Sequence, residues 1–230
     1  MITATDILEM IQRGELPLGS ALPNEADLCM RFQASRTRVR EAVKYLQGKG
    51  FLRVEHGRGT WIEPVEHWDL MDKELWATAL TVGDRFALIR DLVETRRMLE
   101  TRIVELAARN RSAEQLRDLE QDLITMEAAL TEFNPSIFNK ASRRFHDKLA
   151  VAAGNVILLK LSRSLHEALN ITKRSSWDNV EVLRISFRGH QAILKAIEDG
   201  NPEEASKAIQ LHLCDFETSV LETDLASSNG

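Results

Sequence analysis

The segment from Ser35 to Leu46 constrains the fold most, because it predicts a short helix whose two faces differ in character. With about 100° between successive residues of a helix, four apolar side chains share one stripe: Val39, Ala42, Val43 and Leu46. Three cations follow another face at i, i+4 and i+8, and these are Arg36, Arg40 and Lys44. Ser35 is a favourable N-cap, so the arginines lie where a helix end attracts anions. The segment therefore predicts one packed face and one face for an anionic partner.

The neighbouring segments decide between a DNA-binding helix and a solvated surface helix. Residues 22–32 predict a second short helix, which a tight turn at residues 33–35 joins to the first. Paired short helices with such a turn are typical of DNA-binding proteins, in which the second helix enters the major groove. Residues 51–62 read as strand, turn and strand, which predicts a β-wing. Together these segments favour a winged helix-turn-helix.

This part of the chain resembles the winged helix-turn-helix of GntR-type bacterial transcription regulators. The motifs are Leu-Pro-x-Glu at 22–25, Ser-Arg-x-x-Val-Arg-Glu-Ala at 35–42 and Gly-x-Gly-Thr at 57–60. The resemblance implies that Arg36 and Arg40 read bases. We expect phosphate contacts from Ser35, Thr37, Arg38 and Lys44, and wing contacts from His56, Gly57 and Arg58. Ala26 stands where many relatives have an arginine that often touches DNA, so either the operator differs or the remaining contacts carry more of the affinity.

The charge distribution is compatible with a double-stranded DNA partner, although the net charge of the chain is −5. Residues 31–58 hold eight basic side chains against two acidic ones, so the positive charge is local. Cys29 and Cys214 lie far apart, which predicts no disulfide framework and fits a reducing cytosol. The sequence shows no apolar run of about 18 residues and no signal-like leader, so we expect a cytoplasmic bacterial protein without a membrane partner.

From about Asp84 to the end, apolar residues recur at helical spacing with five breaks, which predicts six helices. We therefore predict a mainly α protein, in which a winged helix-turn-helix with a small β-wing precedes an all-α helical bundle. Its parts are the DNA-binding domain (1–64), a packed linker (65–81) and an effector-binding and dimerisation domain (82–230). The segment from Glu94 to Glu100, the pair Phe145-His146 and the stretch from His190 to His212 resemble the FCD-type effector domain of the FadR-like branch. The linker resembles that of sugar-acid regulators.

Three histidines on different predicted helices each share a stripe with apolar residues: His146, His190 and His212. A single one is best explained as a core histidine, but three imidazoles converging in a bundle can bind a divalent transition metal. Zinc or nickel suits imidazole ligands best, and iron and manganese remain possible. The resemblance implies that these three histidines bind a metal together with an aspartate, at the position that Ser142 occupies in this chain. Ser142 cannot supply that negative charge, so the site is weaker, is completed by water or an acidic effector, or is empty.

Arg96 lies in an apolar seam, where its guanidinium needs an anionic or hydrogen-bonding partner. One hypothesis is an internal ion pair with Glu100, one turn away. The other is a clamp for the carboxylate of an effector, because the resemblance implies that this arginine lines the effector cavity. Ser142 and Ser186 each precede a histidine by four residues, so we expect both hydroxyls to face the same cavity, with Trp177 covering it.

These features predict a ligand-responsive, homodimeric repressor of a catabolic operon, which binds a palindromic operator and senses a small organic acid. One alternative keeps the regulator but has a metal-free cavity for a bulkier apolar or acyl-type effector. The other is a metal-dependent enzyme that uses the three histidines. Against the enzyme, no carboxylate at a recognisable spacing serves as a general base, and the N-terminal domain would have no role.

Overall fold

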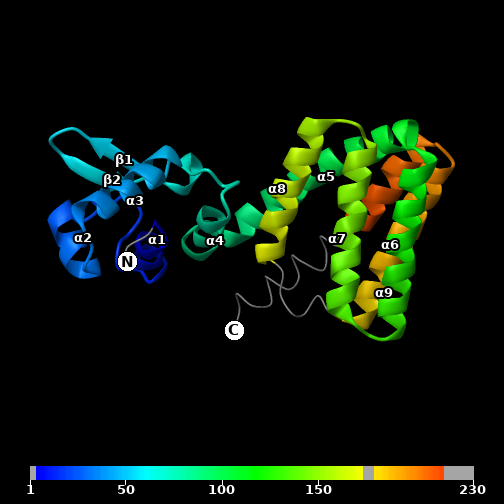
Figure 1. Ribbon diagram of the computed structural model, residues 1–230, viewed down its shortest axis with the longest axis horizontal. Coiled ribbons are helices and arrows are strands. Elements are labelled where there is room, and N and C mark those ends of the chain that lie inside the picture. Colours follow the sequence, from blue (N-terminus) through cyan, green and yellow to red (C-terminus); the bar gives the residue numbers. More distant parts are fainter. Residues whose placement is uncertain (1–3, 173–178, 215–230) are drawn as a thin grey trace. The chain divides into compact units, whose positions relative to one another are not determined.

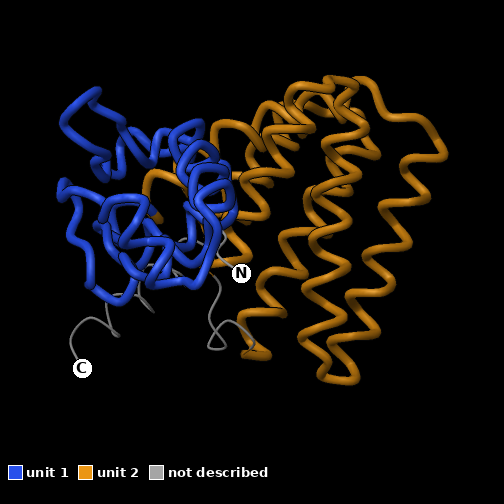
Figure 2. The backbone as a smooth tube through the Cα atoms, turned by 60° about the vertical axis from the view of Figure 1, so that its left-hand side comes forward, with its two compact units in different colours: residues 1–88 blue, residues 89–230 orange. Residues whose placement is uncertain are grey.

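The structure is a computed structural model that describes residues 4–172 and 179–214. It divides into two compact units, Met1–Leu88 and Ile89–Gly230 (Figure 2). The first unit contains a small sheet and short helices, whereas the described part of the second is built from helices (Figure 1). The prediction of a mainly α protein with a winged helix-turn-helix and an all-α bundle is confirmed.

The first unit has the element order of a winged helix-turn-helix. Its elements are α1 (Ala4–Gln12), α2 (Glu25–Phe32), α3 (Arg36–Gly48), β1 (Leu52–Glu55), β2 (Gly59–Ile62), the 3-10 helix η1 (Val65–His67) and α4 (Lys73–Val82). The strands β1 and β2 are antiparallel, with Leu52 opposite Ile62 and Glu55 opposite Gly59. Gly57 in the turn has φ 75° and Gly59 has φ 112°, which are conformations that favour glycine.

Side-chain caps determine where the two helices of the DNA-binding motif begin. Ser35 accepts a hydrogen bond from the backbone N–H of Arg38, as its position before α3 predicts. Helix α2 begins at Glu25 rather than at residue 22, because Asn24 caps it by accepting bonds from Ala26 and Asp27. The turn between the helices places Gln33 in the left-handed region, with φ 49°.

The segment 65–81, which we predicted to be a packed linker, contributes to the core of the first unit. The ring of Trp68 lies 4.5 Å from that of Phe51, centroid to centroid, and its indole N–H donates to the carbonyl of Glu63. Leu75 and Ala79 of α4 are fully buried in the same cluster. These contacts connect the segment to the same core that supports α3.

The second unit contains long helices with sharp ends. They are α5 (Arg85–Asn110), α6 (Ala113–Thr131), α7 (Pro135–Ala152), α8 (Val156–Thr172), α9 (Val180–Glu198) and a last helix described over residues 202–214. Helix α6 packs against α7 and α9 (Figure 1). Phe138 and Phe145 of α7 are among the largest side chains in this core. The ends agree with the predicted breaks, since Ser112 and Gln115 form a capping box before α6 and Gly154 ends α7 with φ 71°.

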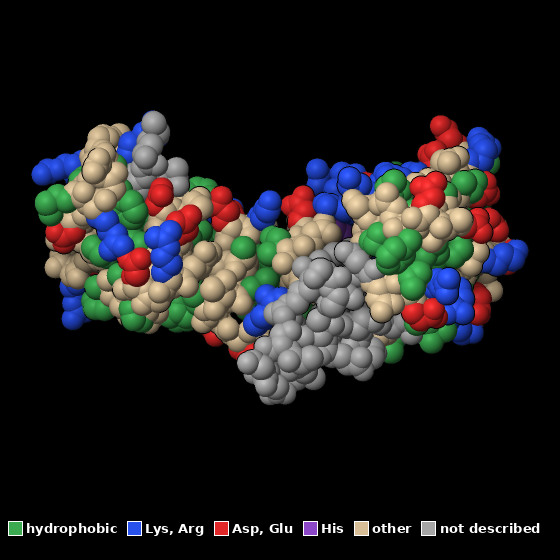
Figure 3. Space-filling view, turned by 90° about the horizontal axis from the view of Figure 1, so that it is seen from below, with side chains coloured by type: hydrophobic (Ala, Val, Ile, Leu, Met, Phe, Trp, Pro, Cys, Tyr) green, Lys and Arg blue, Asp and Glu red, His purple; other side chains and the backbone are tan. Residues whose placement is uncertain are grey.

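The surface carries side chains of both charge signs. Figure 3 shows lysine and arginine interspersed with aspartate and glutamate on the visible face of each unit. Among the described residues, no helix is long and apolar enough to cross a membrane. A mixed surface of this kind leaves recognition of a polyanion to local groups of cations.

Candidate DNA interface and histidine centre

Helix α3 has the two faces that its sequence predicts. Val39 and Leu46 are fully buried in the core of the first unit. The nine residues that we expect to contact DNA are all exposed: Ser35, Arg36, Thr37, Arg38, Arg40, Lys44, His56, Gly57 and Arg58. The helix therefore presents a row of cations and hydroxyls beside the wing, as a recognition helix requires.

Arg40 has a partner on the neighbouring helix that we did not predict. Its Nε donates to both carboxylate oxygens of Glu25, at 2.8 and 2.9 Å. This hydrogen bond lowers the pKa of Glu25 and raises that of Arg40. Glu25 is the last residue of the Leu-Pro-x-Glu motif, so the sequence signal was present but its role was not assigned.

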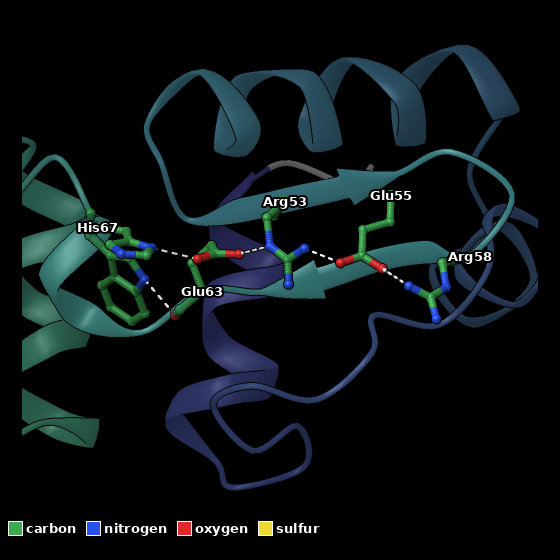
Figure 4. A network of polar contacts seen from close by, with 6 residues as sticks. Arg53, Glu55, Arg58, Glu63 and His67 are labelled. Carbon is green, nitrogen blue, oxygen red and sulfur yellow. Dashed lines mark hydrogen bonds and ion pairs between the residues drawn. The ribbon is translucent and has the colours of Figure 1, made fainter.

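A chain of polar contacts connects the tip of the wing with η1 (Figure 4). Arg53 donates to Glu55 on its own strand and to Glu63 after the second strand. Glu55 also lies 3.7 Å from the guanidinium of Arg58. Glu63 bonds to the ring of His67, and this bond, followed by that of Arg53, lowers the pKa of the Glu63 carboxyl. The wing therefore has its cations compensated by acidic neighbours.

The second unit brings His146, His190 and His212 together, as their sequence pattern predicts. They come from α7, α9 and the last helix, and all three are buried. One ring nitrogen from each lies within 4.8 Å of those of the other two. The rings of His190 and His212 are 4.4 Å apart, and that of His146 is 5.2 Å from His190. This spacing is compatible with a single ion bound by all three.

The hydrogen bonds of His190 select its tautomer. Its Nδ1 lies 2.7 Å from the carbonyl oxygen of Ser186, which can only accept, so Nδ1 carries the proton. Nε2 therefore keeps its lone pair and lies 3.1 Å from the hydroxyl of Ser142. Burial, followed by the charge of His146, lowers the pKa of His190 to about 3. His190 is thus neutral near pH 7, which is the form that binds a metal.

His212 depends on a glycine of α9 that we did not predict. A Cβ atom at Gly189 would lie 2.4 Å from Nδ1 of His212, so a larger residue would displace the ring. The same Nδ1 is buried without a hydrogen-bond partner among the described residues. Burial and the neighbouring His190 hold the pKa of His212 well below its usual value. An unsatisfied buried nitrogen beside two other imidazoles fits a metal ligand set.

Arg96 forms the internal ion pair that was one of its two predicted roles. Its Nε donates to Oε1 of Glu100 at 2.6 Å, and both side chains are buried. Glu100 also accepts a bond from Nε2 of His166 at 2.8 Å, and its Oε2 is 2.9 Å from Nδ1 of His146. Burial alone would raise the pKa of Glu100, but Arg96, with His146, holds it well below its usual range. We predicted the pair with Arg96 but not the two histidines.

The donor set is compatible with a divalent transition metal. Three buried imidazoles bring one ring nitrogen each to within 4.8 Å of the other two, and Glu100 orients His146 in the way that carboxylates orient zinc-bound histidines. The resemblance implied an aspartate at position 142, where the structure has the neutral hydroxyl of Ser142 beside His190. Ser186 contributes its carbonyl rather than its hydroxyl to His190. Trp177, which we expected to cover the site, lies outside the described residues.

Two family models match the chain, one for each unit. The model of bacterial regulatory proteins of the gntR family matches residues 3–62, and the FCD domain model matches residues 91–215. The chain belongs to the gntR family. This regulator therefore combines a DNA-binding helix-turn-helix with an FCD domain, as the sequence motifs indicated.

The chain is also similar to known regulators, and the similarity extends over nearly the whole length of both proteins. The HTH-type transcriptional regulator LutR of Bacillus subtilis is 30% identical over 214 residues, which cover 90% of this chain and 94% of LutR. The galactonate operon transcriptional repressor of Escherichia coli is 26% identical, covering 87% of each chain. Streptococcus agalactiae GntR has a TM-score of 0.55 at 29% identity, covering 94% of this chain and 97% of that one. These relatives favour a regulator over the metal-dependent enzyme.

Proposed function

We propose that this regulator is a ligand-responsive repressor of a catabolic operon and that it senses an organic acid at the histidine centre. The observation that carries the proposal is the meeting of the buried Arg96–Glu100 pair with three converging imidazoles. A buried guanidinium recognises a carboxylate well, and three imidazoles suit zinc or nickel. Among similar proteins, one is named as a repressor of the galactonate operon, and galactonate is a sugar acid.

On the DNA side, a homodimer would place one α3 helix in each half of a palindromic operator. Arg36 and Arg40 would read base edges, because arginine pairs well with O6 and N7 of guanine. Phosphate contacts would come from Ser35, Thr37, Arg38 and Lys44, and wing contacts from His56, Gly57 and Arg58. In this proposal residues 1–64 bind DNA, residues 65–81 connect the domains, and residues 82–230 bind the effector and dimerise, in the bacterial cytoplasm.

On the effector side, His146, His190 and His212 would hold the metal. A bound divalent ion supplies a positive centre that attracts a carboxylate. Arg96 would exchange its partner, releasing Glu100 and receiving a carboxylate of the effector, while Ser142, Ser186 and Trp177 would border the ligand. Because Glu100 also contacts His146 and His166, this exchange would alter contacts between α5, α7 and α8. Two states with different affinity for the acid are what a ligand-controlled repressor requires.

Elemental analysis of protein purified without chelators tests the metal site. We expect about one zinc or nickel ion per chain, because three imidazoles form a typical catalytic-type ligand set with an open position. His190→Ala should lose the metal and keep the fold, whereas the exposed His56→Ala should keep the metal. Retention of stoichiometric metal by His190→Ala would contradict the site.

Thermal shift and DNA-binding assays test the effector. D-Galactonate and other sugar acids should raise the melting temperature of the wild type and change its affinity for operator DNA, and Arg96→Ala should abolish both effects. If the protein holds no metal and responds to no acid, the alternative with a metal-free cavity for a bulkier apolar effector is favoured.

A further inference from the structure

We propose that Glu25 is a positioning residue for base recognition, and that it fixes the guanidinium of Arg40 so that its two terminal nitrogens meet a guanine. The inference rests on the proposed base-reading role of Arg40. Glu25 lies on α2 and Arg40 on α3, fifteen residues apart, and the Nε of Arg40 donates to both oxygens of Glu25.

The geometry restricts how Arg40 can approach a base. A guanidinium offers two edges that make paired parallel hydrogen bonds, one formed by Nε with a terminal nitrogen and one by the two terminal nitrogens. The contact with Glu25 occupies the N–H of Nε. The terminal edge remains for O6 and N7 of guanine, so Arg40 would read the base end-on.

Glu25 is itself held in place by the backbone. It is the first residue of α2, directly after the cap Asn24, whose side chain accepts from the N–H groups of Ala26 and Asp27. Leu22 at the start of the same motif is buried in the core of the first unit. An arginine fixed by such an anchored carboxylate loses less freedom on binding than an unrestrained one.

The negative charge of Glu25 gives the positioning role a distinctive signature. A carboxylate close to the DNA backbone repels phosphates, so its removal strengthens binding that does not depend on sequence. Loss of the fixed guanidinium weakens binding that depends on the base. Glu25→Gln should therefore move specific and non-specific affinity in opposite directions, whereas a residue that contributes only charge moves both in the same direction.

The experiment compares Glu25→Gln with Glu41→Gln in the full-length protein. Glu41 is exposed on α3 and follows Arg40 directly, so Glu41→Gln removes the same unit of negative charge close to Arg40, about 100° around the helix. The probes are a duplex selected from a random library by the wild type and a scrambled duplex of the same composition, measured by fluorescence anisotropy at several salt concentrations. We expect Glu25→Gln to lower the ratio of the two affinities about tenfold, and Glu41→Gln to leave it within about twofold.

A second variant separates the inference from the function on which it rests. In an Arg40→Ala background, Glu25→Gln should no longer change the affinity ratio, because the residue that Glu25 positions is absent. The inference is overturned if Glu25→Gln behaves like Glu41→Gln, or if its effect persists without Arg40. If Arg40→Ala alone leaves the ratio unchanged, the base-reading role of Arg40 fails instead. Circular dichroism melting of each variant shows whether the fold is retained.

Discussion

The Glu25–Arg40 pair of the first unit and the Arg96–Glu100 pair of the second have the same chemistry and differ in exposure. The side chains of Glu25 and Arg40 are 44% and 61% exposed, whereas those of Arg96 and Glu100 are 8% and 4% exposed. Water screens the first pair, so it contributes little to stability and remains available to order a side chain for a partner. The second pair lies where an uncompensated charge is costly, so it is part of the fold as well as of the site.

Glu100→Gln should have the largest effect on stability, because it removes the negative charge that three donor groups share. Those donors are Arg96, His146 and His166. We expect a loss of about 3–5 kcal/mol in the free energy of unfolding, as for other disrupted buried ion pairs. Urea unfolding followed by circular dichroism measures it, with Glu25→Gln as the exposed control that leaves the transition unchanged. Equal effects of the two variants would remove the distinction between the pairs.

Gly189→Ala should have the next largest effect on stability, because the new methyl group would lie 2.4 Å from Nδ1 of His212. We expect destabilisation by about 1–3 kcal/mol, the usual range for an overpacked core, together with loss of bound metal. Gly48→Ala is the matched control, since a Cβ atom there meets nothing within 4 Å. It should be neutral or slightly stabilising because alanine favours a helix. A Gly189→Ala protein with normal stability and metal content would show that His212 can move.

The stability of the metal-free second unit should decrease as the pH falls below about 6.5. Burial lowers the pKa of His190 from 6.5 to about 3 and that of His212 in the same direction. The unfolded chain therefore binds protons that the folded chain excludes, so this stability is complete above pH 6.5 and is lost toward pH 3. Each proton corresponds to a slope of about 1.4 kcal/mol per pH unit.

Urea unfolding with a chelator at pH 7, 6 and 5 measures this slope. His190→Gln should have a shallower slope than the wild type, and the exposed His56→Gln should not change it. A wild-type slope that is flat between pH 7 and 5 would mean that these imidazoles are not buried in the neutral form.

Ser142→Asp should have the smallest of these effects, because it adds a carboxylate beside a ligand set that already exists. The hydroxyl of Ser142 lies 3.1 Å from Nε2 of His190, within reach of a shared ion. We expect metal affinity, measured by competition with a chromophoric chelator, to increase at least about tenfold. Ser136→Asp is a suitable control, because it adds the same carboxylate at an exposed position of α7, the helix that carries Ser142. An unchanged affinity in Ser142→Asp would place the ion elsewhere.

Sequence periodicity predicted features that depend on one helix at a time. The two faces of α3, its Ser35 cap and the inward direction of His146, His190 and His212 all follow from spacing along the chain. Contacts between helices could not be predicted in this way, because they depend on where two helices cross. The pairing of Glu25 with Arg40, the bond from His166 to Glu100 and the fit of His212 against Gly189 are of this kind. Helix α2 begins at Glu25 rather than at the predicted residue 22, because the side-chain cap of Asn24 outweighs the apolar pattern.

The burial of Trp68 in the first unit has a practical consequence for fragments of this protein. The gntR-family match ends at residue 62, and a fragment with that boundary would lack Trp68, Leu75 and Ala79. Phe51, whose ring packs against that of Trp68 at a tilt of 51°, would then lose this cover and face solvent. A fragment intended for spectroscopy or for transplantation onto another sensor should therefore extend to residue 88, where the compact unit ends.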